Sequence, residues 1–208
     1  APSYLMEEGD AIIVTGLTPP QVRYFGFTPY LFSRTDDAGA RVPVFASLGD
    51  TLNHTNIKTA TGEPFGAPFA LVLTSDTQTL GSVTTALIAS GTPPEAINTL
   101  VLPRDALRFG QDPEDDAMML MGRIAVNTML DTAGQAAQTA YLEAPPLNVL
   151  RVASDVVGPA LPVPARSPRG DGVDELAFVD SLDALEDAIL NDVSGAYSES
   201  VAIMPSNI

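Results

Sequence analysis

The stretch Phe69-Ala70-Leu71-Val72-Leu73-Thr74-Ser75-Asp76 joins an apolar run to a helix cap, and it decides the fold class. The apolar run from Phe69 to Leu73 predicts a buried strand. Ser75 or Asp76 is a good N-cap for a helix from about Thr77 to Ser90. Gly91 and Pro93 end that helix, and Thr99–Leu102 supplies the next strand. The segment is therefore a strand–helix–strand unit.

A second unit of the same kind follows. Ala117–Val126 predicts a strand, Thr132–Glu143 a helix stopped by Pro145, and Leu147–Val152 a final strand. The alanines of this helix favour close packing on a sheet. Two tandem β-α-β units over residues 69–153 predict a ferredoxin-like arrangement, with two helices on one face of a four-stranded sheet. The alternative is that these strands extend an N-terminal sheet.

Residues 1–60 read as antiparallel strands placed beside the repeat. Ala11–Val14 is a short apolar run, Val22–Phe32 is an aromatic run broken by Pro29, and Val42–Ala46 follows a turn. The fold class predicted for the core, residues 1–156, is α+β.

Beyond the core, residues 157–170 form a proline-rich linker and residues 171–208 an acidic tail. Ser181 caps a helix that ends near Asn191. An apolar stripe on this helix consists of Leu182, Leu185 and Ile189. A helix this short is marginal in water, so we expect the stripe to dock on the core, on a protein partner or on a second copy.

The charge of the chain argues against several partners. Ten basic residues face 26 acidic ones, giving a net charge of −16. Nucleic acid requires a basic footprint, and the arginines form no basic stripe. No apolar run approaches the length of a membrane span. The acidity is typical of a soluble or salt-tolerant surface.

The start of the chain bears on its cellular location, and the absence of cysteine bears on its chemistry. The chain starts Ala1-Pro2-Ser3 without an initiator methionine, which fits a mature product after removal of a leader and fits a trimmed or proteolytic fragment equally well. Of these, we prefer the first, which predicts an exported, extracytoplasmic or secreted protein. It contains no cysteine, so disulfides and thiol chemistry are excluded.

The single histidine, His54, lies in a polar loop with Asp50, Asn53 and Lys58. A functional interpretation makes His54 a general base oriented by Asp50, with Lys58 stabilising an anion. Asp50 and His54 could instead be two ligands of an open metal site. The structural interpretation is a turn in which Asp50 and Asn53 bond their own backbone.

The aromatic run supplies candidates for ligand binding. Alternation along a strand places Tyr24 and Tyr30 opposite the core, where their phenols could line a pocket for a sugar or an aromatic ligand. Arg34 is a second candidate anion stabiliser. A core strand with hydroxyls at its rim explains the same residues.

The stretches Arg23–Tyr30 and Ala46–Asn53 resemble uncharacterised, exported microbial proteins over about 30 of the 208 residues. The resemblance implies export. It names no activity and assigns no functional residue.

Two acidic clusters are candidates for calcium, which takes six to eight oxygen ligands. They are Asp112, Glu114, Asp115 and Asp116 in one cluster, and Asp171, Asp174 and Glu175 in the other. Neither matches an EF-hand loop, and a solvated acidic loop explains each. No cofactor or metal ligand set is predicted.

Two hypotheses about function therefore stand. The first is an exported hydrolase-like enzyme that acts on a small or carbohydrate-like substrate, with His54 as the base. The second is a non-catalytic binding or structural module of a larger extracellular protein or assembly.

Overall fold

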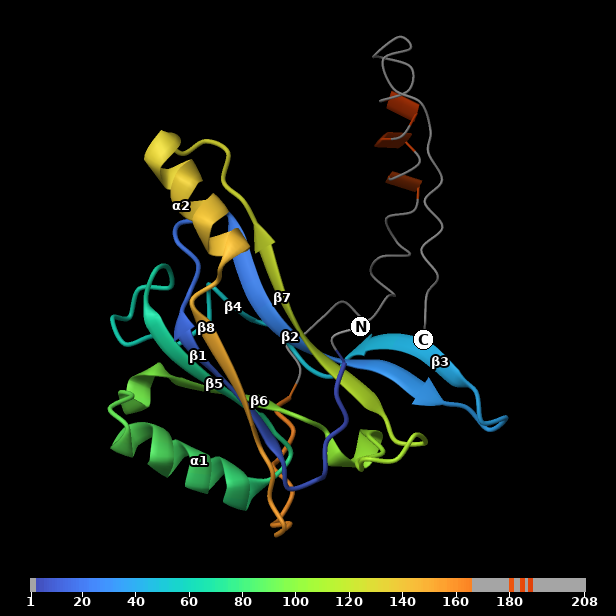
Figure 1. Cartoon of the computed structure of the whole chain (residues 1–208). Coiled ribbons are helices and arrows are strands. Elements are labelled where there is room, and N and C mark those ends of the chain that lie inside the picture. The colour runs from blue at the N-terminus through green and yellow to red at the C-terminus, as the bar shows by residue number, and fades with distance from the viewer. Residues whose placement is uncertain (1–2, 166–179, 182–183, 186, 189–208) are drawn as a thin grey trace. The chain divides into compact units, whose positions relative to one another are not determined.

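The computed structural model describes residues 3–165, 180–181, 184–185 and 187–188 (Figure 1). The chain divides into two compact units, Ala1–Ala165 and Arg166–Ile208. The boundary falls within the proline-rich segment 157–170. The fold that follows is that of the first unit.

One four-stranded sheet, here called the helix-covered sheet, has the strand order β6-β5-β1-β8. Its strands are β6 (Ile97–Val101), β5 (Pro68–Thr74), β1 (Ala11–Leu17) and β8 (Leu147–Val152). β5 and β6 are parallel neighbours, whereas β1 runs antiparallel to both β5 and β8. The N-terminal strand therefore lies at the centre of this sheet.

The second sheet, the aromatic sheet, is built around the long strand β2. It contains β2 (Tyr24–Thr35), β3 (Arg41–Ser47), β4 (Leu52–Asn53) and β7 (Ala117–Ala125). β7 pairs with β2 from Tyr24 to Ser33 and occupies one edge. β3 and β4 each pair with residues of β2 that also pair with β7. Because a strand has only two edges, β3 and β4 lie on the edge of β2 opposite to β7.

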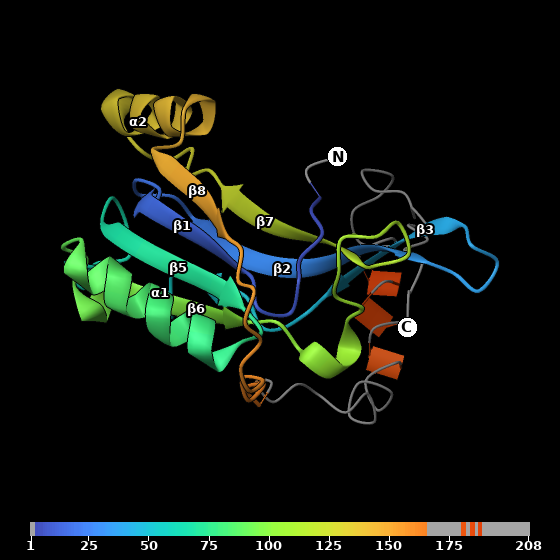
Figure 2. The same ribbon diagram turned by 60° about the horizontal axis from the view of Figure 1, so that its bottom comes forward.

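The core lies between the two sheets. Alternate residues of β2, including Phe25, Phe27 and Leu31, pack against alternate residues of β1 and β5 such as Ile12 and Leu71. Strand alternation sends one set of side chains to this interface and the next set to the opposite face. The first unit is thus a sandwich of two sheets with one helix layer outside (Figure 2).

α1 (Thr77–Ala89) forms that helix layer. Val83 packs with Ala11, Ile13 and Val72, which are the side chains that β1 and β5 turn away from the main core. The predicted first β-α-β unit is therefore confirmed, with β5 and β6 as parallel neighbours. Short 3₁₀ turns, Pro94–Ala96 and Arg104–Ala106, flank β6.

The predicted α+β class is confirmed, but the strands do not form the predicted ferredoxin-like sheet. β7 and β8 flank α2 (Thr132–Glu143) as predicted, yet β7 joins the aromatic sheet and β8 the helix-covered sheet. α2 lies at the ends of the strands, away from α1 (Figures 1 and 2), and only its Gln138 and Tyr141 are buried. The prediction that the alanines of α2 pack closely on a sheet was wrong.

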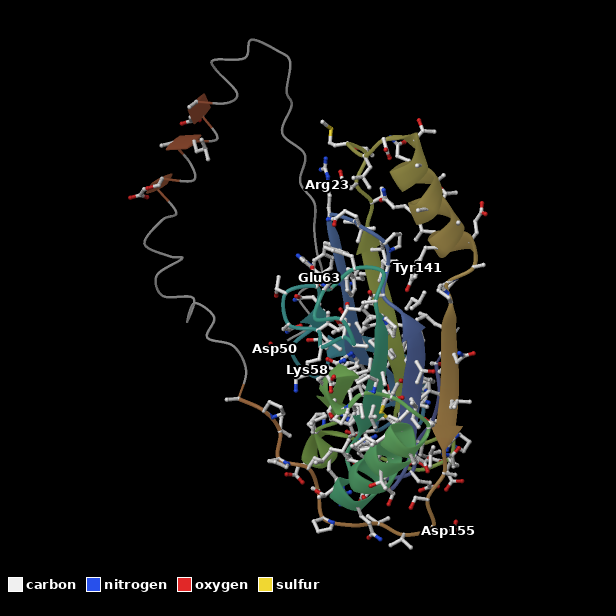
Figure 3. All side chains as sticks on the ribbon, turned by 90° about the vertical axis from the view of Figure 1, so that its left-hand side faces the viewer. Arg23, Asp50, Lys58, Glu63, Tyr141 and Asp155 are labelled. Carbon is white, nitrogen blue, oxygen red and sulfur yellow. The ribbon has the colours of Figure 1, made fainter. Side chains whose placement is uncertain are left out.

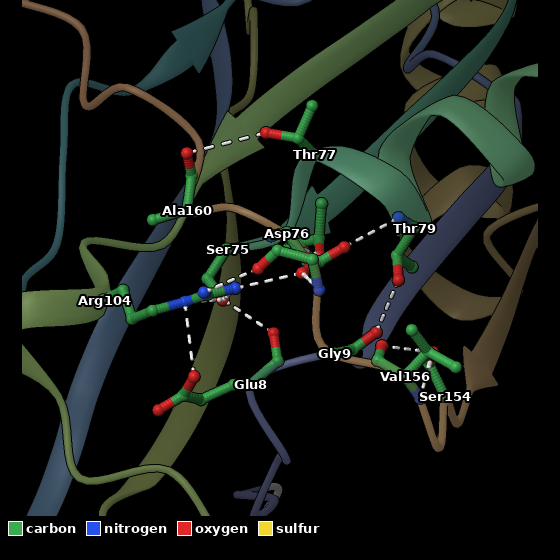
Figure 4. Close-up of polar contacts among 12 residues, drawn as sticks. Glu8, Gly9, Ser75, Asp76, Thr77, Thr79, Arg104, Ser154, Val156 and Ala160 are labelled. Carbon is green, nitrogen blue, oxygen red and sulfur yellow. Dashed lines mark hydrogen bonds and ion pairs between the residues drawn. The ribbon is translucent and has the colours of Figure 1, made fainter.

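Asp76 fixes the start of α1 and the first part of the proline-rich segment (Figure 4). Its carboxylate accepts the Thr79 N–H at 2.8 Å, the Arg104 guanidinium at 3.0 Å and the Gly158 N–H. Ala160 forms a β-bridge with Asp76. Residues 158–161 are therefore attached to the core, and the predicted linker is ordered at its beginning.

In the second unit, positions 180–181, 184–185 and 187–188 are helical, where a helix was predicted. Ser181 is not its N-cap, because Ser181 and the preceding Asp180 are already helical. Leu185 is 56% exposed. Leu182 and Ile189 lie outside the described residues, as do Asp171, Asp174 and Glu175. Among the described residues, no helix has both the length and the apolar character that crossing a bilayer requires.

Candidate functional site

His54 follows β4 and lies in a cage of aromatic rings. The backbone N–H of His54 donates to the Phe25 carbonyl at 3.2 Å, and this bond holds the loop against β2. The imidazole stacks on Phe65 at 5.9 Å between ring centroids, and Tyr24 meets it edge-on at 5.6 Å. Phe25 completes the cage at 6.2 Å. Phe65 comes from the loop before β5 and was not predicted.

The electrostatic setting of His54 differs from that of an oriented general base. Its Nδ1 is buried and has no hydrogen-bond partner within the described residues. Buried N–H groups without an acceptor are rarer in folded proteins than buried acceptors without a donor. The arrangement therefore favours the tautomer with Nδ1 unprotonated and the proton on Nε2. In that form Nε2 donates a hydrogen bond and cannot accept a proton.

The polar neighbours of His54 have other tasks. Asn53 Oδ1 accepts both the N–H and the hydroxyl of Thr55, at 2.8 and 2.7 Å. This is the backbone turn that the structural interpretation predicted for Asn53. Asp50 lies in the turn before β4 and does not bond Nδ1 of His54.

Lys58 is held through its main chain. Its N–H donates to Asn98 Oδ1 and its carbonyl accepts from Asn98 Nδ2, both at 2.8 Å. The Lys58 side chain is exposed, and Figure 3 shows it on the same side of the molecule as Asp50. Asn98 is buried on β6 and acts as a latch for the loop. Sequence reasoning missed this role because Asn98 is 40 residues away.

Arg34 belongs to a separate ion pair. Its Nε donates to Asp116 Oδ1 at 2.8 Å, its NH2 group to Asp116 Oδ2 at 2.5 Å, and the same group to the Ala106 carbonyl. Arg34 lies nine positions after Phe25 along the extended strand β2, which is about 30 Å. The structure therefore does not bring Arg34 to His54. It is a clamp on the far end of β2.

Asp116 is fully buried, and it comes from the cluster considered for calcium. Burial by itself would raise the pKa of Asp116, but the Arg34 guanidinium and the Arg108 N–H outweigh it and hold that pKa below its usual value. Among the described residues, no three acidic or histidine side chains converge on a point that a metal ion could occupy.

Tyr24 and Tyr30 alternate along β2 with the core residues Phe25, Phe27 and Leu31, so they belong to the opposite face of the aromatic sheet, here called the outer face. Tyr30 is nevertheless buried, with 7% of its surface exposed. A Cβ added to Gly26 would meet the Tyr24 hydroxyl at 2.6 Å, Thr51 Cγ2 at 2.6 Å and Asn53 Cβ at 3.2 Å. Tyr24 therefore folds over Gly26 on this face. Thr28 and Thr51 share a hydroxyl bond of 2.8 Å beside it.

Tyr30 belongs to a cluster that the sequence did not reveal, the outer aromatic cluster of Tyr30, Phe32 and Phe45. Tyr30 stacks on Phe45 at 4.8 Å, and Phe32 meets Phe45 edge-on at 6.2 Å. Arg123 of β7 lies over the Tyr30 ring at 5.5 Å and donates to its hydroxyl at 2.7 Å. Arg123 was missed because its pairing with β2 is set by the fold.

Phe45 is the most unusual member of the cluster. It is 43% exposed and has a φ of 53°, in the left-handed region that bulky side chains rarely adopt. It lies on β3 beside the irregularity at Leu31 and Ser33 of β2. A backbone outlier of this kind at an exposed phenylalanine motivates a hypothesis of function.

A third feature is a small cavity of about 180 Å³ at the end of the sandwich beside α2. Phe25 and Phe27 of β2, Ile124 of β7, Tyr141 of α2 and Leu147 of β8 contribute to its wall. Figure 3 shows Tyr141 on the side of α2 that faces the strands.

No family model, curated protein or solved structure matches the chain.

Proposed function

We propose that the protein is a non-catalytic binding module that engages a protein partner through the outer face of the aromatic sheet. The observation that carries the proposal is Phe45, a half-exposed aromatic residue in a strained backbone conformation. Backbone strain of this kind costs of order 1–3 kcal/mol, and residues that carry it cluster at active sites and ligand-binding sites.

The residue types of the outer face support a protein partner. Tyr24, Phe45, Met121 and Arg123 are at least partly exposed and are of the kinds enriched in the cores of protein interfaces. None of the four is acidic, although the chain has 26 acidic and 10 basic residues. Arg123 is exposed and already oriented by Tyr30, so its guanidinium is prepared for a carboxylate or carbonyl of the partner.

The hydrolase hypothesis has less support from the same residues. A general base needs a nitrogen that can accept a proton, and a second group that fixes the other nitrogen as a donor. His54 has its Nδ1 buried among aromatic rings without such a group. Arg34 is bound to Asp116, which leaves the exposed Lys58 as the anion stabiliser of that hypothesis.

The test compares two variants with equal exposure. Phe45→Ser removes the exposed ring of the cluster, and Ile88→Ser removes an aliphatic group from α1; both parent side chains are 43% exposed. Partners are isolated with the intact protein, purified, and titrated against each variant. We expect at least tenfold weaker binding for Phe45→Ser and for Arg123→Ser, and unchanged binding for Ile88→Ser.

Equal losses in Phe45→Ser and Ile88→Ser would contradict the proposal. So would turnover of an ester or glycoside substrate that disappears in His54→Ala while the variant stays folded, because that result assigns the hydrolase function. A partner that proves to be a second copy of the chain would be detected by light scattering, and it would place the same face in a homodimer.

A further inference from the structure

The cavity beside α2 has an apolar wall built from three layers of the fold. β2 supplies Phe25 and Phe27, β7 supplies Ile124, and the segment entering β8 supplies Pro145 and Leu147. Tyr141 closes it from α2. Because these residues come from both sheets and from the helix, the cavity lies where the sandwich opens at its end and is partly enclosed.

Two wall positions of the cavity, Gly26 and Gly122, lack a side chain. Gly122 of β7 lines it and pairs with Phe27 in a regular stretch of ladder. A Cβ added to Gly122 would lie 3.6 Å from Phe27 Cε1, an ordinary contact on the core side of the strand. Gly122 does not have a positive φ, so its backbone does not require glycine. A larger residue could occupy this position, and it would fill the cavity.

The polar groups at the wall are already satisfied. The Tyr141 hydroxyl donates to the Leu17 carbonyl at 3.0 Å, and burial raises the pKa of Tyr141 to about 12, so it stays a donor at neutral pH. Arg123 also lines the cavity, but its guanidinium donates to Tyr30 on the outer face. The one charged side chain of the wall therefore has its guanidinium at Tyr30, which is not a residue of the cavity wall.

We propose that this cavity is a binding site for a small, uncharged, apolar molecule of about six to nine non-hydrogen atoms. The size follows from comparison with an engineered apolar cavity of about 150 Å³, which stays dry and binds benzene. The site is separate from the outer face and does not depend on the proposed function. Its ligand is held by burial of apolar surface alone.

The experiment uses the full chain and three soluble probes of similar size: indole, phenol and benzoate. Binding is measured by calorimetric titration and by thermal unfolding. We expect indole and phenol to bind saturably and to raise the melting temperature by about 3 °C at ten times the dissociation constant. Benzoate should bind at least tenfold more weakly than phenol, because its charge would lose its hydration.

Two variants should change the affinity for apolar probes in opposite directions, and a third is a control. Gly122→Val fills the cavity and should weaken indole binding at least tenfold. Gly81→Ala, on α1 with open space around it, is the matched control and should bind like the parent. Leu147→Ala enlarges the cavity and should let the larger probe 2-naphthol bind at least tenfold more tightly than it binds the parent.

Unchanged indole binding in a folded Gly122→Val variant overturns the proposal, as does benzoate that binds more tightly than phenol. The absence of saturable binding of both neutral probes to the parent also overturns it. If Gly122→Val does not fold, the 2-naphthol comparison in Leu147→Ala decides: a gain supports the site and no gain contradicts it.

Discussion

Two aspartates show at the residue scale how a strongly acidic chain uses buried carboxylates. Asp76 and Asp116 are fully buried, and each is bound by an arginine that is partly exposed. Desolvation opposes their ionisation, but hydrogen bonds from N–H groups and from Arg104 or Arg34 more than compensate, so both pKa values lie below the usual value. These acids hold α1 and the end of β2 in place.

Replacing Asp76 separates its two tasks. Asn is as good an N-cap as Asp, so Asp76→Asn keeps the bond from Thr79 and loses the charge opposite Arg104. We expect Asp76→Asn to lower the free energy of unfolding by about 1–3 kcal/mol and Asp76→Ala by about 3–5 kcal/mol, measured by urea denaturation. Equal effects of the two variants would show that the helix cap contributes little beyond the ion pair with Arg104.

The lowered pKa values also set the response to acid. A carboxyl with a lower pKa in the folded state stabilises the fold above its unfolded pKa, which is about 3.9 for aspartate. That stability is lost as the pH falls below about 4 and through the folded pKa. We expect the urea midpoint of the parent to fall steeply between pH 4 and pH 2.5. In Asp76→Asn the fall should be shallower, and an identical slope would contradict the assignment.

Gly26 is a second residue whose identity has a local cause. Its Cβ position is filled by the Tyr24 hydroxyl and the Thr51 methyl group. Gly26→Ala should displace the Tyr24 ring from the outer face and destabilise the fold by about 1–3 kcal/mol, as overpacking does. Tyrosine fluorescence and urea denaturation measure the two effects. The matched variant Gly49→Ala has open space around its Cβ and should show neither.

At the element scale, the strands and helices themselves could be predicted from the sequence better than the way in which they pair and pack. Asp76, Gly91 and the apolar spacing of α1 are local signals, so the first β-α-β unit could be predicted. The partners of β7 and β8 could not, because strand pairing is set by contacts such as Phe27 with Gly122 that are 95 residues apart. The same reason hides Arg123 beside Tyr30, whereas alternation alone placed Tyr24 and Tyr30 on one face.

α2 provides a test at this scale because a single polar contact ties its buried face to β1. The Tyr141 hydroxyl donates to the Leu17 carbonyl, and apart from Gln138 the rest of the helix is largely exposed. Tyr141→Phe should cost about 1 kcal/mol of stability. Amide hydrogen exchange should speed up several-fold in α2 and remain unchanged in α1, which serves as the internal control. Equal acceleration in both helices would mean that Tyr141 acts on the whole core instead.

At the scale of the whole molecule, charge is distributed unevenly along the chain. Up to Arg169 there are 17 acidic and ten basic residues, and beyond it there are nine acidic residues and no basic one. Repulsion among like charges destabilises a compact state, and salt screens it over about 10 Å at 0.1 M. The four ion pairs of the described residues involve carboxylates that are mostly buried, which salt screens less than exposed charges.

The net effect of salt on stability should therefore be positive. We expect the melting temperature at pH 7 to rise by several degrees between 0.05 and 1 M NaCl, because relief of repulsion exceeds the weakening of the ion pairs. The control neutralises three exposed acids with a triple variant, Glu95→Gln, Asp105→Asn and Glu143→Gln. This variant should begin at a higher melting temperature in low salt and gain less from NaCl. If NaCl raises the melting temperature of the parent and of the variant equally, salt acts through exclusion from the protein surface. In that case charge repulsion does not limit the stability of the chain.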